Sequence, residues 1–194
     1  MTIIKIGHEE PFKGIASIDN LRATVPEALR TAAIEGSAML RAAGVRHVLV
    51  GGVAVSCNGY GRTTQNVDFA VGPCAFEYRD KAWFLRIGLP FKILGIPIHY
   101  VAPSNPFEQA MLDQYLEIPA AGHVPVLPLE PLVVMKLISM RHKDLADLVE
   151  LFKRQIPNLD SVRAFVASNL PSQVSMLDEL ITCAEDEMSQ EGIP

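Results

Sequence analysis

The segment that decides the fold is His47–Val71, which reads HVLVGGVAVSCNGYGRTTQNVDFAV. It predicts a buried strand, a turn at Gly51 and Gly52, a short helix, a polar loop and a second strand that carries one acid, Asp68. Two adjacent glycines let the backbone turn sharply and come close to a ligand. A helix that begins at Val53 would direct its free N–H groups and the positive end of its dipole at the same turn, where they favour a phosphate group.

The chain before this segment predicts an extended arm followed by a helix. The arm contains one short edge strand at Ile3–Ile6. Thr24 and Glu27 have the spacing of a capping box, and the apolar residues after them recur at helical intervals as far as Ala43. Gly44 is a natural residue for the end of such a helix.

The chain after Asp68 predicts several short elements. Mixed charged and aromatic residues indicate a helix, and a turn with a good capping residue precedes another. The expected elements are a helix at Ala75–Leu85, strands at Phe91–Leu94 and Ile96–Val101, a helix at Pro106–Leu112 capped by Asn105, and a hairpin formed by Tyr115–Ile118 and Val124–Leu127.

From Pro128 onward the hydrophobic pattern has the helical period and predicts four helices. A mixed first half and an all-helical second half make α+β the predicted fold class. We expect an α/β part with its N-terminal arm and helix over residues 1–127. A helical subdomain over residues 128–194 should pack on it.

Composition limits the function classes. The chain has 194 residues, of which 49% are hydrophobic and 20% charged, so it is long and apolar enough to bury a core. Its net charge of −5 argues against broad binding to a nucleic-acid backbone. The three cysteines, Cys57, Cys74 and Cys183, are widely spaced and predict reduced thiols and no zinc site. No signal peptide or membrane span is evident, so a soluble cytoplasmic protein is expected.

The segment around the glycine turn resembles the nucleotidyltransferase superfamily, whose best-known fold is the palm of DNA polymerase beta. That family has an apolar residue, Gly-Gly or Gly-Ser, a spacer, and then Asp-x-Asp or Asp-x-Glu on the next strand. Here Val50-Gly51-Gly52 match the beginning, and the strand reads Asn66-Val67-Asp68. The small bacterial members often carry Arg-x-Thr before the acids, which Arg62-Thr63-Thr64 resembles.

The second half is similar to the same small bacterial proteins, which include toxin–antitoxin branches. They follow the palm with Leu-Glu-x-Leu-(apolar)-x-Lys-Leu and then Arg-x-Lys-Asp-x-x-Asp. The segments Leu129–Leu137 and Arg141–Asp147 agree in order and nearly in spacing. The residues alone leave two roles open for Lys136, which either extends from the core or reaches a triphosphate. For Lys143, Asp144 and Asp147 they favour a solvated helix face over direct chemistry.

The resemblance implies transfer of a nucleoside monophosphate from a nucleoside triphosphate (NTP) to a hydroxyl group. It implies Mg²⁺ or Mn²⁺ as the cofactor, because two metal ions normally screen the triphosphate and activate the attacking oxygen. Asp68 would be the catalytic metal ligand. The nucleotide-binding residues would be Gly51, Gly52, Arg62, Thr63 and Lys136.

Two of the three acids that the family pattern expects are replaced in this sequence. Asn66 stands at the first acid, and His99 stands where a neighbouring strand normally supplies the third. An amide brings no negative charge, and imidazole is a poor ligand for magnesium. We therefore expect weak activity or none with magnesium, and the sequence leaves open whether the protein is an enzyme.

Several alternatives remain open from the sequence. The acceptor of an active enzyme would be a small molecule, a tRNA end or a protein hydroxyl. Instead, the chain would be a non-catalytic nucleotide- or protein-binding regulatory partner of the antitoxin kind, or a purely structural protein. A homodimer and a toxin–antitoxin-type partner are both compatible with the resemblance. Asp68 itself would be a structural acid if it paired with Arg62.

Overall fold

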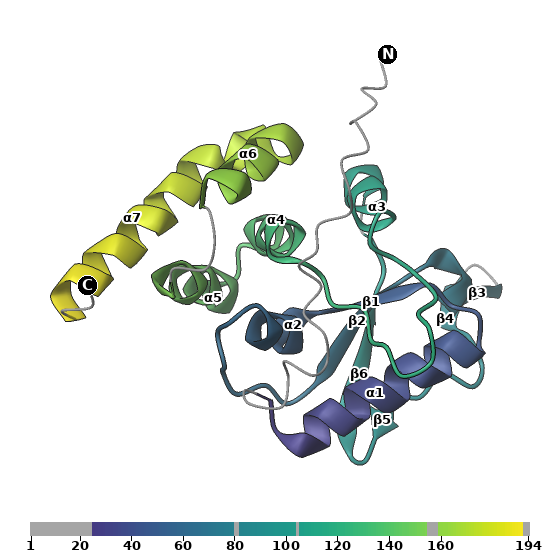
Figure 1. Ribbon diagram of the computed structural model, residues 1–194. Helices are drawn as coiled ribbons and strands as arrows, with labels where there is room; N and C mark the ends of the chain where they lie inside the picture. Colours follow the sequence, from purple (N-terminus) through teal and green to yellow (C-terminus); the bar gives the residue numbers. More distant parts are fainter. Residues whose placement is uncertain (1–24, 80–81, 104, 155–158, 192–194) are drawn as a thin grey trace.

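The computed structural model describes residues 25–79, 82–103, 105–154 and 159–191. The predicted arm, the edge strand at Ile3–Ile6 and the capping residue Thr24 lie outside these ranges. Figure 1 shows the arrangement of the described elements, with a sheet and its helices in the first half and helices alone in the second.

The central sheet has four strands in the order β1 (His47–Val50), β2 (Val67–Val71), β6 (Ile96–Val101) and β5 (Lys92–Ile93). β1 runs antiparallel to β2, β2 parallel to β6, and β6 antiparallel to β5, so the sheet is mixed. The register places Asp68 of β2 between Val50 and His99 on the two neighbouring strands. The predicted strands before the glycine turn and around Asp68 and His99 are therefore confirmed.

Helix α1 (Glu27–Ala42) covers one face of this sheet. Ser37 on α1 donates a hydrogen bond of 2.7 Å to Nε2 of His47, and Phe69 packs so closely on α1 that a Cβ atom at Gly36 would lie 2.9 Å from its ring. Since side chains alternate along a strand, Asp68 projects from the opposite face of β2. The helix ends as predicted, because Gly44 has a φ of +68°.

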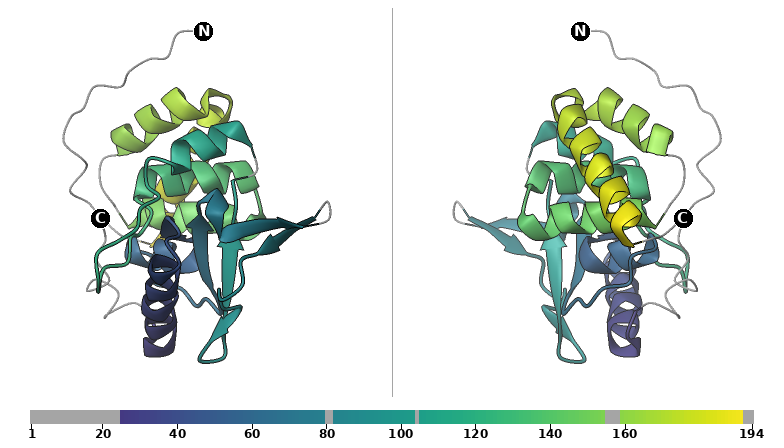
Figure 2. Two further views of the ribbon diagram at one scale, coloured as in Figure 1. Left: turned by 90° about the vertical axis from the view of Figure 1, so that its right-hand side faces the viewer. Right: turned by 90° about the vertical axis from the view of Figure 1, so that its left-hand side faces the viewer.

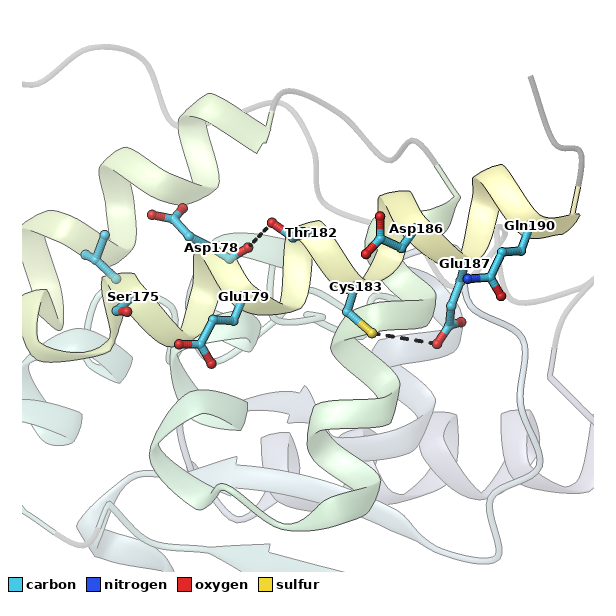
Figure 3. A pocket seen from close by; sticks show the side chains of 9 residues that line it. Ser175, Asp178, Glu179, Thr182, Cys183, Asp186, Glu187 and Gln190 are labelled. Atoms are coloured by element: carbon cyan, nitrogen blue, oxygen red, sulfur yellow. Dashed lines mark hydrogen bonds between the residues drawn. The ribbon is translucent and has the colours of Figure 1, made fainter.

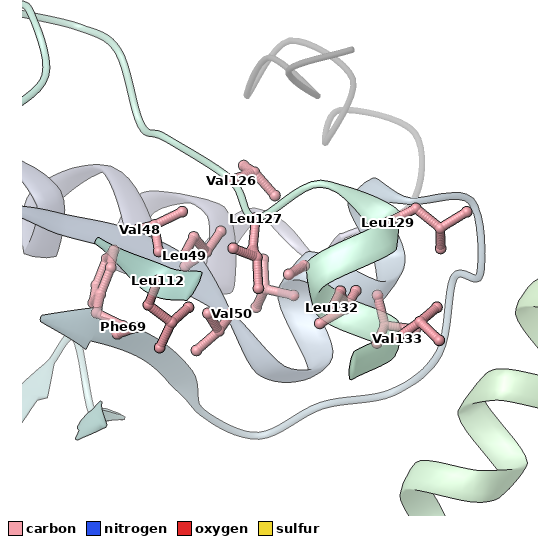
Figure 4. Close-up of a cluster of buried hydrophobic side chains, with 14 of the residues drawn as sticks. Val48, Leu49, Val50, Phe69, Leu112, Val126, Leu127, Leu129, Leu132 and Val133 are labelled. Atoms are coloured by element: carbon pink, nitrogen blue, oxygen red, sulfur yellow. The ribbon is translucent and has the colours of Figure 1, made fainter. Parts of the chain in front are cut away.

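The other face is packed by apolar residues from several segments. Helix α2 (Gly51–Cys57) begins directly after β1 and contacts β1 and β2. Helix α3 (Pro106–Leu112) is capped as predicted, since the side chain of Asn105 accepts a hydrogen bond from the backbone N–H of Glu108. Figure 4 shows side chains of the buried core, contributed by the sheet, by α3, by the segment before residue 128 and by helix α4 (Leu129–Ser139) (Val48, Leu49, Val50, Phe69, Leu112, Val126, Leu127, Leu129, Leu132 and Val133).

The predicted helix at Ala75–Leu85 is wrong. A 3₁₀ turn at Pro73–Ala75 leads into β3 (Phe76–Arg79), which pairs antiparallel with β4 (Ala82–Leu85). The alternation of aromatic and charged residues from position 76 to 79 has the period of a strand, and aromatic residues favour strands. The mixture of charges in the segment had obscured that period.

The predicted hairpin of Tyr115–Ile118 and Val124–Leu127 is also wrong. The two segments each make a bridge to β1, one between Glu117 and His47 and one between Val126 and Leu49. Both segments have strand-like sequences, but each finds its partner on the outer edge of β1. They thereby cover an edge that would otherwise expose unpaired backbone groups.

The second half consists of the four predicted helices, α4 (Leu129–Ser139), α5 (His142–Lys153), α6 (Leu159–Asn169) and α7 (Val174–Glu191). α4 packs against α5 and α6, and α5 packs along α7. In the right view of Figure 2, α7 (yellow) lies in front of the green helices of the second half. The predicted α+β fold, a mixed sheet flanked by helices and followed by a helical half, is confirmed. The division into two domains at residue 128 stays a prediction.

Candidate functional site

The turn after β1 brings Gly51 against Asp68. Gly51 has a φ of +66°, a conformation that side chains other than glycine rarely adopt. A Cβ atom at this position would overlap Oδ2 of Asp68 and lie 2.8 Å from its Cγ. The lack of a side chain at Gly51 is thus what allows the carboxylate to reach the turn. The glycine turn and the carboxylate of Asp68 therefore lie in direct contact at the end of the sheet, and we call them together the glycine–Asp68 site.

Asp68 is held by the two residues at the predicted acid positions. Nδ2 of Asn66 donates a hydrogen bond of 2.5 Å to Oδ1 of Asp68, and Nδ1 of His99 lies 3.1 Å from the same oxygen. Nδ2 of Asn66 is also 3.2 Å from Nδ1 of His99. The sequence thus correctly predicted which three side chains meet, since Asn66 and Asp68 share a face of β2 and His99 is opposite Asp68 on β6.

This cluster does not fit a pair of magnesium ions. Mg²⁺ requires hard oxygen ligands, chiefly carboxylates, in octahedral geometry. Here the one carboxylate accepts an N–H group from the amide of Asn66 on Oδ1, and the imidazole of His99 lies 3.1 Å from the same oxygen. Within the described ranges, no three His, Cys, Asp or Glu side chains come together in a way that could hold a metal ion.

Arg62 lies beside the turn but pairs with an acid from the second half. Its Nη2 donates a hydrogen bond of 2.9 Å to Oδ2 of Asp147, and its Nε lies 2.5 Å from Oδ1 of the same carboxylate. A Cβ atom at Gly52 would lie 3.2 Å from Nη2 of Arg62 and 2.7 Å from Oγ1 of Thr64. Arg62 and Thr64 therefore line the turn, whereas Thr63 between them is exposed. The alternative pairing of Arg62 with Asp68 is wrong.

Lys136 is buried and joins two acids of α5. Its Nζ lies 2.6 Å from Asp147 and 3.0 Å from Asp144. Both acids are buried, with 2% and 3% of their surface exposed, so the interpretation of a solvated helix face is wrong. An isolated charge is unfavourable in the interior, and burial of these acids is possible because each is paired with cations. Lys136 therefore occupies a core position beside the two acids, and its contact with a triphosphate stays a prediction.

Arg141 completes this network and was not identified from the sequence as a site residue. Its Nε donates a hydrogen bond of 2.5 Å to Oδ2 of Asp144, which also accepts one from Ser139. Burial alone would raise the pKa of Asp144, but hydrogen bonds from Arg141, Ser139 and Lys136 outweigh it and lower the pKa to about 2. The pKa of Arg141 is raised, first by its hydrogen bond to Asp144 and in smaller part by the charge of Asp68.

A shallow surface hollow lies elsewhere, along the outside of α7. Figure 3 shows its lining, which comes entirely from that helix and includes four acids. One of these acids, Asp178, pairs with Arg163, and another, Glu187, pairs with Lys153. None of the residues predicted to form the site lies in this hollow. Among the described helices, none combines the length and apolarity needed to cross a bilayer.

Comparisons with known proteins add one structural match. No protein-family model matches the sequence, and no curated protein matches it. One solved structure that matches is described as the crystal structure of an antigenic nucleotidyltransferase-like protein from Paracoccidioides brasiliensis. The chains share 13% identity, with 80% of this chain and 94% of that chain covered, and the TM-score is 0.40. Because this similarity is low, the function is argued below from the contacts of Asp68 and of the glycine turn.

Proposed function

We propose that this protein is a nucleotidyltransferase-like protein that binds a nucleotide at the glycine–Asp68 site and does not transfer a nucleotidyl group by magnesium chemistry. The observation that carries the proposal is the environment of Asp68. A single carboxylate whose Oδ1 is in contact with both the amide of Asn66 and the imidazole of His99 has neither the charge nor the number of oxygen ligands that two magnesium ions require.

The turn supports the nucleotide part of the proposal. Because Gly51 and Gly52 have no side chains, Asp68, Thr64 and Arg62 lie directly against the backbone of the turn, so a ligand bound there would meet both charged and hydroxyl groups. The guanidinium group of Arg62 lies next to this backbone and is fixed by Asp147. Lys136 acts indirectly in this proposal, since its ammonium group holds Asp147 in place. Thr63 is exposed at the same loop and would contact the ligand from outside.

A thermal-shift experiment tests this function. The wild-type protein is heated with each of the four common ribonucleoside triphosphates, with and without Mg²⁺ or Mn²⁺. A second protein carries Asn66→Asp and His99→Asp, which restore the two missing acids. We expect stabilisation of the wild type to be independent of metal, because the cluster offers too few carboxylates. The double variant should gain a metal-dependent component.

Two outcomes would contradict the proposal. Strong magnesium-dependent stabilisation of the wild type would mean that Asp68, Asn66 and His99 hold a metal despite their donor set. A wild type that no nucleotide stabilises, with or without metal, would remove nucleotide binding and favour a structural role.

A regulatory, protein-binding function is the alternative, and one observation favours it. Four large apolar side chains in the segment from residue 84 to 94 are more than half exposed, namely Phe84, Ile87, Phe91 and Leu94. Exposed apolar residues gathered in one segment are typical of interaction sites. Light scattering tests the homodimer form of this idea. Dimers that Ile87→Ser with Phe91→Ser convert to monomers would support it, and wild-type monomers at every concentration would exclude it.

A further inference from the structure

The loop beside Gly52 is joined to the second half of the chain by a continuous series of charged contacts. Arg62 contacts Asp147, Asp147 contacts Lys136, Lys136 contacts Asp144, and Asp144 contacts Arg141. The series contains three cations and two carboxylates, which leaves one positive charge in excess (3 − 2 = 1). The location of that excess charge decides where an anionic ligand would bind.

The excess charge is available at Arg141. The side chain of Lys136 is 6% exposed and that of Arg62 is 24% exposed, and both cations are directed at the buried carboxylate of Asp147. The side chain of Arg141 is 62% exposed. Among the described residues, its contacts are confined to Nε and Asp144. The two Nη groups are therefore free to donate hydrogen bonds, and a guanidinium group matches the geometry of a phosphate.

The guanidinium group is held in one orientation at the N-terminal end of α5. Asp144, which binds its Nε, is itself fixed by Lys136 and Ser139. Residues three positions apart lie on one side of a helix, so Arg141 is on the side of Asp144 and Asp147, and Asp147 pairs with the Arg62 that lies beside Gly52. An arginine that is already positioned loses little side-chain entropy when it binds a ligand.

We propose that Arg141 is the residue that binds the phosphate groups of the ligand, in the absence of a metal ion. That the ligand is a nucleotide rests on the proposed function. That Arg141 binds a phosphate anion does not depend on it. It assigns the attraction of the triphosphate to the exposed guanidinium group of Arg141. Lys136, which is buried, and Arg62, which is partly buried, hold the loop and α5 together.

Calorimetric titration in buffer with EDTA tests this assignment. The ligands are ATP, inorganic tripolyphosphate and adenosine. The variants are Arg141→Ala and Arg141→Lys, and Arg46→Ala is the matched control. Arg46 is also an exposed arginine paired with one carboxylate, that of Asp113. It precedes β1, whereas the glycine turn follows β1, so the two lie at opposite ends of this strand.

We expect Arg141→Ala to weaken the binding of ATP and of tripolyphosphate about tenfold or more, the effect of losing a hydrogen-bonded charge. Arg141→Lys should show a smaller loss, because it keeps the charge but not the planar fork of donors. Arg46→Ala should bind both ligands as the wild type does. Because the side chain of Arg141 is largely exposed, circular dichroism should show both of its variants folded.

The results separate this inference from the proposed function. Wild type that binds ATP without metal, with equal affinity in Arg141→Ala, would overturn the role of Arg141 and leave the proposed function standing. If the wild type binds tripolyphosphate but not ATP, and Arg141→Ala binds tripolyphosphate more weakly, the phosphate-binding role of Arg141 is supported and the proposal of nucleotide binding is overturned. A wild type that binds neither anion would overturn both.

Discussion

The buried ammonium group of Lys136 gives a prediction whose size follows from its contacts. Lys136→Met keeps the length of the side chain and removes the charge that Asp144 and Asp147 share. Two hydrogen bonds to buried carboxylates are lost, each contributing roughly 1.5–3 kcal/mol. Removing one partner of a buried ion pair costs about 3–5 kcal/mol. Each acid keeps another cation, Arg141 or Arg62, so we expect the lower end, about 3 kcal/mol.

Urea unfolding followed by far-ultraviolet circular dichroism measures this loss. The control is Lys143→Met, since Lys143 is an exposed lysine at the beginning of α5, and we expect a change within about 0.5 kcal/mol. In a thermal melt, a loss of about 3 kcal/mol corresponds to a decrease of about 6–12 °C in Tm for a chain of this size. Adding Asp144→Asn to Lys136→Met should recover part of the loss, because the buried carboxylate of Asp144 would otherwise be left with the exposed Arg141 as its one cation.

The reasoning would be refuted by a small effect. If Lys136→Met lowers the free energy of unfolding by less than about 1 kcal/mol, the pairs with Asp144 and Asp147 behave like exposed surface ion pairs. If the double variant is less stable than Lys136→Met alone, the loss arises from packing and not from charge.

Three further predictions concern acid stability and the glycine turn. Because the pKa of Asp144 is depressed in the folded protein, the unfolded state binds its proton first as the pH falls. About 2 kcal/mol of stability should therefore be lost between about pH 4 and pH 2, and Asp144→Asn should flatten that part of the curve of stability against pH. Burial lowers the pKa of His47 from 6.5, so stability should also decline as the pH falls below 6.5, and His47→Gln should remove that decline in urea titrations at a series of pH values. In urea unfolding, Gly51→Ala should destabilise the fold by about 1–3 kcal/mol more than Gly122→Ala. Both glycines have a positive φ, but of these two Gly51 alone faces the carboxylate of Asp68. Equal losses of stability in the two variants would show that crowding at the turn is unimportant.

Local sequence patterns predicted most of the elements that bring the glycine turn, Asp68 and His99 together. The apolar run before Gly51, the alternation around Asp68 and the turn at Gly95 are short-range features, and short-range features fix backbone geometry and side-chain period. The same patterns placed His99 on a neighbouring strand. The meeting of Asn66, Asp68 and His99 could therefore be expected from the sequence.

The misses have a different origin. The segments at Tyr115–Ile118 and Val124–Leu127 have strand-like sequences, but nothing local indicates that each would pair with β1 and not with the other. The segment that forms β3 and β4 carries both charged and aromatic residues, and pairing between the two strands decided its conformation.

The sequence by itself determined the glycine turn, the strand that carries Asp68 and the amphipathic helices, because backbone freedom and hydrophobic period are properties of neighbouring residues. Only the tertiary structure decided the partners of the charges. Arg62 and Asp147 are 85 positions apart, and they meet because α5 packs where the loop after α2 passes. Burial then makes that choice of partner decisive, since a charge removed from water is stable only beside its counter-charge.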